Sequence, residues 1–279
     1  MALGSAQQTI TTGANFIPEL WGPMVIKAVE ENLVHWDKTW DWSDSAKGKG
    51  DTIHVPAVSN LAVNAKTANA QVTLNAPTED VVNLLINRHD ECSFLIEDIL
   101  KVQSAYNLMK FYTDKAGYAL AEQKDTRINT LVASLSQVVG AQGVDLGDAD
   151  IRNAIEYLDL ANVPESERFM IIHPTQKNAL FAIEKYFRAD QRGDGASSIL
   201  KKGKFGEIYG VGVSVSTNCG TSGGTRLNSM FHRQCFATAS QLTRTQSDYI
   251  LEYLGNLTVA DCIYGEVEAR DSFGVWMQS

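Results

Sequence analysis

The chain has 279 residues, of which 44% are hydrophobic and 20% charged, and its formal net charge at pH 7 is −9. The hydrophobic content predicts a folded protein, and the length suffices for one large domain or two to three small ones. A negative charge argues against broad phosphate binding, which needs clustered lysines and arginines. We find no signal peptide at the start, and no apolar run approaches the ~18 residues of a membrane span.

Four scattered cysteines form no Cys-x-x-Cys pair, which argues against zinc and against a disulfide framework. They are typical of buried thiols in a reducing compartment: Cys92, Cys219, Cys235 and Cys262.

The first 15 residues are small and polar, and we expect a mobile arm. Residues Phe16–Trp36 then show helical spacing after Pro18, with apolar residues on one face. Four tryptophans fall between Trp21 and Trp42. They fit either a local core or an arm that packs on a neighbouring subunit, because aromatic residues are enriched in the cores of interfaces.

Residues 43–93 contain no aromatic residue, so this segment lacks the material for a core of its own. Alternating apolar residues predict strands at Thr52–Val58 and Val82–Ile86. One interpretation is a disordered insertion. The alternation at both ends favours a long two-stranded arm that needs another surface, since an isolated hairpin is marginally stable in water.

Apolar residues from Leu95 to Leu135 recur about every 3.6 positions, the period of a straight α-helix. No proline interrupts this run, and we expect one spine helix of about 40 residues, roughly 60 Å long. No partner helix of similar length is evident elsewhere in the sequence, so we expect sheet elements against the spine.

Residues 145–240 alternate between strand and helix patterns, which predicts a compact α/β module. Asp148 is expected to cap a first helix and Pro174 to open a second. The strands are expected at Arg168–Ile172, Ile208–Thr217 and Phe231–Ala239. Residues 249–277 again read as strands, and we expect them to return to the spine.

Adjacent His89, Asp90, Glu91 and Cys92 invite a metal or catalytic interpretation. Neighbours on an extended chain point to opposite faces, so they cannot all converge on one ion. We interpret them as a charged junction between arm and spine, with the acidic residues near a helix N-terminus. The glycine-containing loop that starts at Cys219 lacks the Gly-Lys-Ser/Thr ending of a phosphate-binding loop, and a surface turn is expected.

A small basic cluster could contact nucleic acid, although a solvated loop is the simpler interpretation: Arg188, Arg192, Lys201, Lys202 and Lys204. The triplet Arg192-Gly193-Asp194 carries almost no weight as an adhesion motif. His173 could act as a base, but no serine or cysteine nucleophile has a suitable context. We therefore predict no enzyme, no catalytic, cofactor-binding or metal-binding residue, and no cofactor.

The order of parts resembles the major capsid protein of tailed bacteriophages, with the Hong Kong 97-type fold. Three stretches are similar to that family: Phe169-Met-Ile-Ile-His-Pro-Thr-Gln-Lys-Asn-Ala-Leu, Gly206-Glu-Ile-Tyr-Gly-Val-Gly-Val-Ser-Val-Ser-Thr-Asn and Phe16-Ile-Pro-Glu-Leu-Trp. The resemblance covers nearly the whole chain and implies an α+β fold.

By this resemblance, residues 1–42 are an N-arm, 43–90 an extended two-stranded E-loop, 91–144 a P-domain spine helix, and 145–240 an α/β A-domain, with 241–279 as strands returning to the P-domain. The A-domain is expected around five-fold and six-fold axes, and the E-loop over a neighbour's P-domain. Some relatives cross-link an E-loop lysine to an asparagine of another subunit. Lys66 lies in the arm, but no catalytic carboxylate matches, and we expect no cross-link.

The implied function is self-assembly, as pentamers and hexamers, into an icosahedral head around double-stranded DNA. The implied partners are a separate scaffolding protein, a portal, an optional decoration protein, and DNA through weak non-specific contact; no membrane is involved. The protein is expected in the virion after assembly in the host bacterial cytoplasm. The alternatives are an α/β enzyme or ligand-binding protein that uses residues 145–240, or another phage structural protein such as a decoration or tail component.

Overall fold

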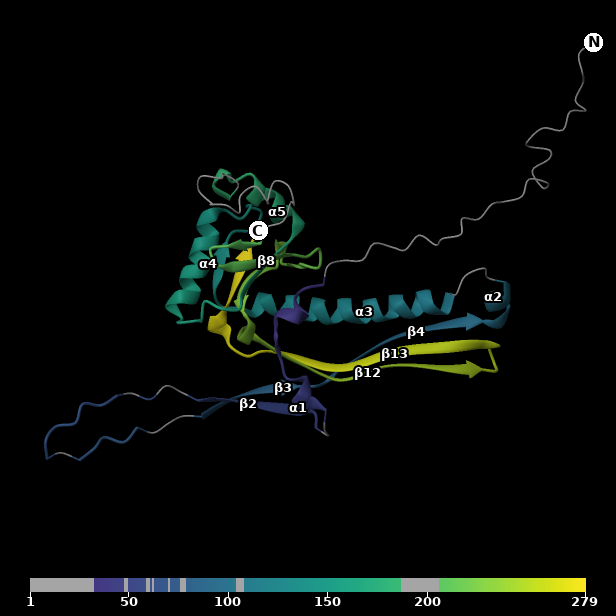
Figure 1. The fold of residues 1–279 in the computed structure, drawn as a ribbon, viewed down its shortest axis with the longest axis horizontal. Helices are drawn as coiled ribbons and strands as arrows, with labels where there is room; N and C mark the ends of the chain where they lie inside the picture. The colour runs from purple at the N-terminus through teal and green to yellow at the C-terminus, as the bar shows by residue number, and fades with distance from the viewer. Residues whose placement is uncertain are drawn as a thin grey trace, which may run out of the picture. The chain divides into compact units, whose positions relative to one another are not determined.

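The computed structural model describes residues 33–47, 50–58, 61, 63–69, 71–75, 79–103, 108–186 and 206–279, within the compact unit Glu31–Ser279 (Figure 1). The expected arm at 1–15 and most of the helix expected at Phe16–Trp36 lie outside these residues. Trp36 itself begins a short 3₁₀ helix, Trp36–Lys38.

The described α-helices are α1 (Ser43–Ala46), α2 (Asp98–Gln103), α3 (Leu108–Leu131), α4 (Asp148–Leu160) and α5 (Pro174–Phe181). Further 3₁₀ turns lie at Val132–Ser134, Glu184–Tyr186, Arg233–Cys235 and Asp271–Phe273.

A four-stranded sheet has the order β1 (Trp40–Asp41), β12 (Phe236–Ile250), β13 (Gly255–Glu268) and β4 (Arg88–Glu97). The central strand β13 pairs antiparallel with both β12 and β4. Helix α3 packs on one face of this sheet, where Ala116 and Leu120 join Ala260, Cys262 and Tyr264 in a buried cluster. Sheet and helix thus form a two-layer unit.

The expected single helix from Leu95 to Leu135 is wrong at its N-terminal end. The chain remains in β4 to Glu97, continues in the short α2, and forms α3 over 24 residues, about 36 Å. Ten residues of β4 pair in register with β13, so tertiary hydrogen bonding overrides the local helical spacing. Leu95 and Ile99 are 37% and 62% exposed, so their helical spacing corresponds to no buried helix face.

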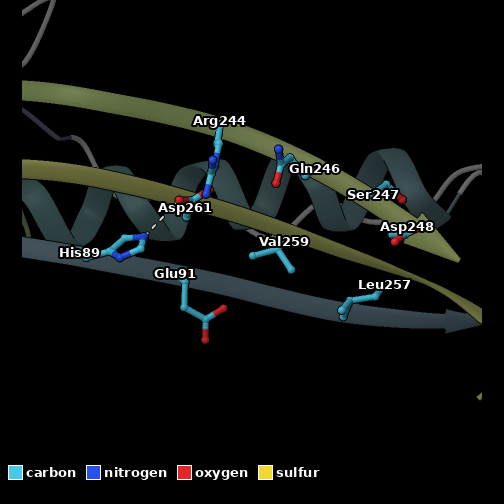
Figure 2. A pocket seen from close by; sticks show the side chains of 9 residues that line it. All are labelled: His89, Glu91, Arg244, Gln246, Ser247, Asp248, Leu257, Val259 and Asp261. Carbon is cyan, nitrogen blue, oxygen red and sulfur yellow. Dashed lines mark hydrogen bonds and ion pairs between the residues drawn. The ribbon is translucent and has the colours of Figure 1, made fainter. Parts of the chain in front are cut away.

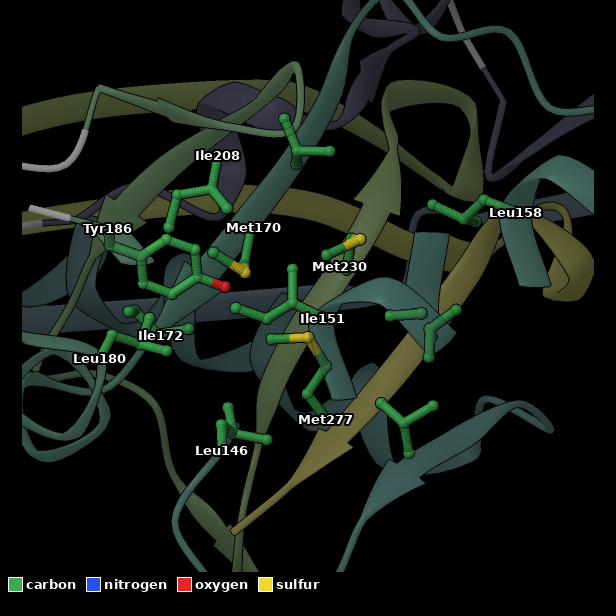
Figure 3. Packing of buried hydrophobic residues seen from close by; sticks show 14 of the residues in the cluster. Leu146, Ile151, Leu158, Met170, Ile172, Leu180, Tyr186, Ile208, Met230 and Met277 are labelled. Carbon is green, nitrogen blue, oxygen red and sulfur yellow. The ribbon is translucent and has the colours of Figure 1, made fainter. Parts of the chain in front are cut away.

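A six-stranded mixed sheet has the order β5 (Val138–Gly140), β14 (Gly274–Gln278), β11 (Asn228–His232), β6 (Arg168–Ile172), β8 (Val211–Val215) and β7 (Glu207–Ile208). Both of its faces are buried, because successive residues of a strand enter different clusters. Met170 and Ile172 pack with Ile151 and Leu158 of α4 (Figure 3). Ile171 points to the opposite cluster, which includes residues from the end of α3.

The helices and strands expected within 145–240 form, with two corrections to the strands. Residues Ile208–Thr217 are a hairpin rather than one strand, because Tyr209 and Gly210 adopt φ values of +52° and +79° at the turn between β7 and β8. The expected strand Phe231–Ala239 is interrupted by the 3₁₀ turn Arg233–Cys235. The loop after Cys219 is a small hairpin of β9 (Thr221–Ser222) and β10 (Thr225–Arg226), so the expected surface turn is confirmed.

The C-terminal residues divide between the two sheets. Strands β12 and β13 lie against the spine as expected, whereas β14 pairs with β5 and β11 in the six-stranded sheet. The expectation that all of 249–277 returns to the spine is therefore wrong for β14. Its Val275 and Met277 supply buried side chains to the cluster under α4.

Strands β2 (Thr52–Val58) and β3 (Glu79–Leu85) pair antiparallel, which confirms a two-stranded base for the arm. The base packs on the sheet through a cluster that includes Leu84 and Ile86. Gly265 of β13 permits this contact, since a Cβ there would lie 2.1 Å from the carbonyl oxygen of Leu85. Among the described residues between the strands, 61–75 continue no ladder.

Candidate assembly surfaces

The face of the four-stranded sheet opposite α3 is only partly covered. Even-numbered residues of β13 point to α3, and odd-numbered residues point the other way. The arm base covers the odd-numbered residues at one end, including Ile263 and Gly265. At the other end Asp261, Val259 and Leu257 line a shallow hollow of about 750 Å³ (Figure 2).

The hollow spans three strands in register. Arg244 of β12, Asp261 of β13 and Glu91 of β4 form one row across the sheet. Asp261 Oδ1 accepts from Arg244 Nε at 2.8 Å, and Asp261 Oδ2 lies 3.1 Å from His89 Nε2 (Figure 2). The hydrogen bond from Arg244, then that from His89, lowers the pKa of the Asp261 carboxyl. Glu91 has no ion pair in the described part of the chain, so its charge is open to a partner.

The arm beyond its base exposes aliphatic side chains. Val63 is fully exposed and Leu74 is 85% exposed, with Leu61 and Val72 also exposed. A hydrogen bond from Asn64 Nδ2 to Asn75 Oδ1, at 2.9 Å, links the two sides of the arm. Such a segment leaves its apolar surface in water unless another surface covers it.

A second apolar patch lies where α2 meets the turn between β12 and β13. It consists of exposed aliphatic and aromatic side chains: Ile99, Leu100, Leu251, Tyr253 and Leu254. The hydroxyl of Tyr249 donates to Asp98 Oδ2 at 2.8 Å, which joins α2 to the end of β12. This patch is also typical of a protein contact surface.

A buried polar cluster joins the start of the described chain to α3. His35 and Asp125 are 0% and 1% exposed, with 2.9 Å between His35 Nδ1 and Asp125 Oδ2. Asp125 also accepts from the backbone N–H groups of His35 and Trp36 and from Asn218 Nδ2. Sequence reasoning missed this cluster. The only signal was a carboxylate three residues before Ile128 on the helix.

A second polar cluster surrounds Asp148. This residue is the first of α4, and Gly147 holds the N-cap position, so the expected cap at Asp148 is wrong by one residue. Its carboxylate accepts from Tyr186 Oη at 2.8 Å, Tyr209 Oη at 2.6 Å and Lys185 Nζ at 3.1 Å. Burial opposes the shift, but these hydrogen bonds lower the pKa of Asp148 to about 2. The cluster ties the turn between β7 and β8 to the start of α4.

The residues weighed as catalytic or metal-binding lie apart or have structural partners. His89, Asp90, Glu91 and Cys92 alternate along β4, as expected for a strand. Their expected position beside a helix N-terminus is wrong, since five further residues of β4 lie between Cys92 and the start of α2 at Asp98. No group of three or more metal-ligating side chains converges in the described residues.

The structure describes His173, but it does not describe the basic cluster or the Arg-Gly-Asp triplet. His173 is the N-cap of α5, where its Nδ1 accepts from the backbone N–H of Thr175 at 3.3 Å. The basic cluster and the Arg192-Gly193-Asp194 triplet fall within 187–205, outside the described residues.

Cys219, Cys235 and Cys262 are buried free thiols, and Cys92 is half-buried. None of the helices in the described part combines the length and apolar character that a membrane crossing needs.

No family model matches the chain, and no curated protein matches it. Solved structures do. A chain from Mycobacterium phage Che8 is 27% identical, with a TM-score of 0.81, over 94% of this chain and 97% of that one. The capsid structure of the cyanophage P-SCSP1u gives 16% identity and a TM-score of 0.80 over 96% and 94%. The mature capsid of bacteriophage PhiM1 gives 13% and 0.75 over 98% and 97%.

These likenesses span nearly the full length of both partners and show that the chain has the Hong Kong 97-type capsid fold. The predicted α+β fold is confirmed. The predicted resemblance to the major capsid proteins of tailed bacteriophages is confirmed by the same matches. The alternative of an α/β enzyme or ligand-binding protein finds no support among them.

Proposed function

We propose that this protein assembles as pentamers and hexamers into an icosahedral phage head that encloses double-stranded DNA, and that it acts structurally rather than as an enzyme. The observation that carries the proposal is the exposed arm, whose aliphatic side chains lack a covering surface in the described residues. The likeness of the protein to capsid chains, over nearly its whole length, supports a place in the virion shell.

The arm of one copy covers the open sheet face of a neighbouring copy. Its own base already packs on one end of that face, through Leu84, Ile86 and Gly265. The other end is the hollow lined by Leu257 and Val259, which continues the same surface. A neighbour's arm there would bury aliphatic surface on both sides, at roughly 25 cal/mol per Å².

A second contact between copies uses the apolar patch at α2 and the turn between β12 and β13. Leu251 is 77% exposed and lies next to Tyr253 and Leu254 in the chain. Association with another copy would remove this patch from water, which favours assembly.

We also propose the division of the chain into an N-arm (1–42), an E-loop (43–90), a P-domain (91–144 with 241–279) and an A-domain (145–240). The P-domain would include α3, β13 and most of β4 and β12, while β14, although it lies within 241–279, completes the six-stranded sheet of the A-domain. The further partners are a separate scaffolding protein, a portal and an optional decoration protein. DNA contact would be weak and non-specific because the net charge is −9, and assembly would take place in the host bacterial cytoplasm.

The test is to express the protein with and without its scaffolding protein and to examine the product by negative-stain electron microscopy. We expect closed icosahedral shells, or rings of five and six subunits. A monodisperse monomer under every condition, scaffold included, would contradict the proposal.

A further inference from the structure

We infer that Lys66 of the arm forms an ion pair with Glu91 in the hollow of a neighbouring copy. This inference rests on the proposed function, because it requires that the arm of one copy lies over the sheet of another. It adds the pair of residues that fixes where along the sheet the arm lies.

The arm carries one ionisable side chain. Between residues 59 and 78 the sequence contains Lys66 and no other charged residue or histidine. Lys66 is exposed and has no ion pair in the described part of the chain. One charge in an otherwise neutral segment is a strong determinant of register, since a displaced arm would leave the ammonium group against apolar or neutral surface.

The hollow carries an excess of negative charge. Its lining has three carboxylates, those of Glu91, Asp248 and Asp261, and the single guanidinium of Arg244, which leaves a formal charge of −2 with His89 neutral. Asp261 is already paired with Arg244 and contacts His89. The hollow therefore suits one cation from outside.

Of the two remaining carboxylates, Glu91 is the better partner. Asp248 Oδ1 accepts from the backbone N–H of Tyr249 at 2.8 Å, whereas the side-chain carboxylate of Glu91 has no hydrogen-bond partner among the described residues. Glu91 also projects from β4 beside the hollow, clear of the Asp261 group (Figure 2). Its carboxylate is thus free to accept the ammonium group of Lys66.

The apolar surroundings strengthen this pairing. Leu257 lies beside Asp248 and Val259 beside Gln246 in the hollow, and Val63 and Leu74 are exposed on the arm. When the aliphatic side chains of the arm pack on those of the hollow, they exclude water from the ion pair, and salt in the solvent then screens the pair less. Reversing one charge would then bury two like charges together, which costs far more than the loss of an exposed pair.

The experiment is a charge exchange, with shells quantified by sedimentation after co-expression with the scaffolding protein. Lys66→Glu and Glu91→Lys should each lower the shell yield about tenfold or more. The double variant, which restores opposite charges, should return the yield to within about threefold of wild type. Lys66→Arg keeps the charge and should assemble normally.

Matched controls separate a specific pair from a general charge effect. Glu156 is exposed on α4, away from the hollow, so Glu156→Lys should assemble and should not rescue Lys66→Glu. Thermal melting of each protomer reports the fold independently. Single variants that assemble like wild type, or a double variant that fails while its protomer melts normally, would overturn the ion pair. Failure of wild type to form shells would instead overturn the proposed function.

Discussion

Removing the Asp125 carboxylate should destabilise the protomer more than any surface substitution on α3. The carboxylate lies 1% exposed and has four polar partners. Its Oδ1 accepts from the backbone N–H of His35 at 2.6 Å and from that of Trp36 at 3.1 Å. Its Oδ2 accepts from Asn218 Nδ2 at 3.0 Å and lies 2.9 Å from His35 Nδ1.

In Asp125→Ala these groups stay buried and lose their acceptor. Each buried donor without a partner costs about 1–3 kcal/mol, and breaking a buried pair costs about 3–5 kcal/mol. We expect a loss of about 3–5 kcal/mol in the free energy of unfolding, out of the roughly 5–15 kcal/mol typical of a domain. Asp125→Asn keeps one acceptor oxygen and should lose about 1–3 kcal/mol.

The assay is urea unfolding of the unassembled protomer at pH 7, followed by circular dichroism and tryptophan fluorescence. Trp36 is a useful probe because its ring packs edge-on against Tyr264, with centroids 5.7 Å apart. Asp114 is exposed on the same helix, so Asp114→Ala is the matched control and should change stability by less than about 0.5 kcal/mol. Equal effects of the two alanine variants would refute the reasoning.

The pH dependence gives a second readout of the same carboxylate. Burial raises the pKa of Asp125, but the hydrogen bonds from His35, Trp36 and Asn218 outweigh it and hold the pKa below the ordinary value of 3.8. A carboxyl group whose pKa is lowered on folding stabilises the protein above its unfolded pKa, and this contribution is lost as pH falls through the folded pKa. The difference between wild type and Asp125→Ala should therefore hold above about pH 4 and shrink below it.

Two further predictions concern covalent cross-linking of the particles and the separate roles of the arm and of α3. Mature particles boiled in detergent should run as a single band near the chain mass of 30.6 kDa, because no residue of the sequence matches the catalytic carboxylate of the relatives that cross-link. A ladder of multimers that disappears in Lys66→Ala would contradict this. Deleting residues 60–75 should leave a folded protomer that forms no shells, whereas Leu120→Pro should lose the fold, since proline inside α3 costs about 3 kcal/mol or more. Circular dichroism and sedimentation distinguish the two, and equal helix loss in both variants would contradict the separation of arm from spine.

Elements with a strong local pattern were predictable from the sequence. The strand Thr52–Val58 matches its expected bounds, and Arg168–Ile172 does too, because alternation or a continuous apolar run needs no distant partner to be read. Pro174 opens α5 as expected, since its fixed φ suits a first turn. The error at Leu95–Glu97 has the opposite cause, because pairing with residues about 160 positions later decides that segment.

The candidate surfaces were predictable only in part. The arm could be expected from the lack of aromatic residues in 43–93, which is a local property of the sequence. The hollow could not, because it forms only when β4 and β12 pair with β13 and bring Glu91 and Arg244 to either side of Asp261. The same holds for the buried cluster, whose members His35 and Asp125 are 90 positions apart.

The register of strand β13 decides both which side chains pack against α3 and which side chains line the hollow. Its even-numbered residues, such as Ala260 and Cys262, bury against α3, while odd-numbered Val259 and Asp261 form the hollow. A slip of one residue would exchange these sets, placing the Asp261 carboxylate against α3 and the small residues outside. The pairing with β12 shifts once, between Ser240 and Leu242, and is regular from there to the end of the hairpin. The register that places α3 on the sheet therefore also fixes the arrangement of the side chains in the proposed assembly surface.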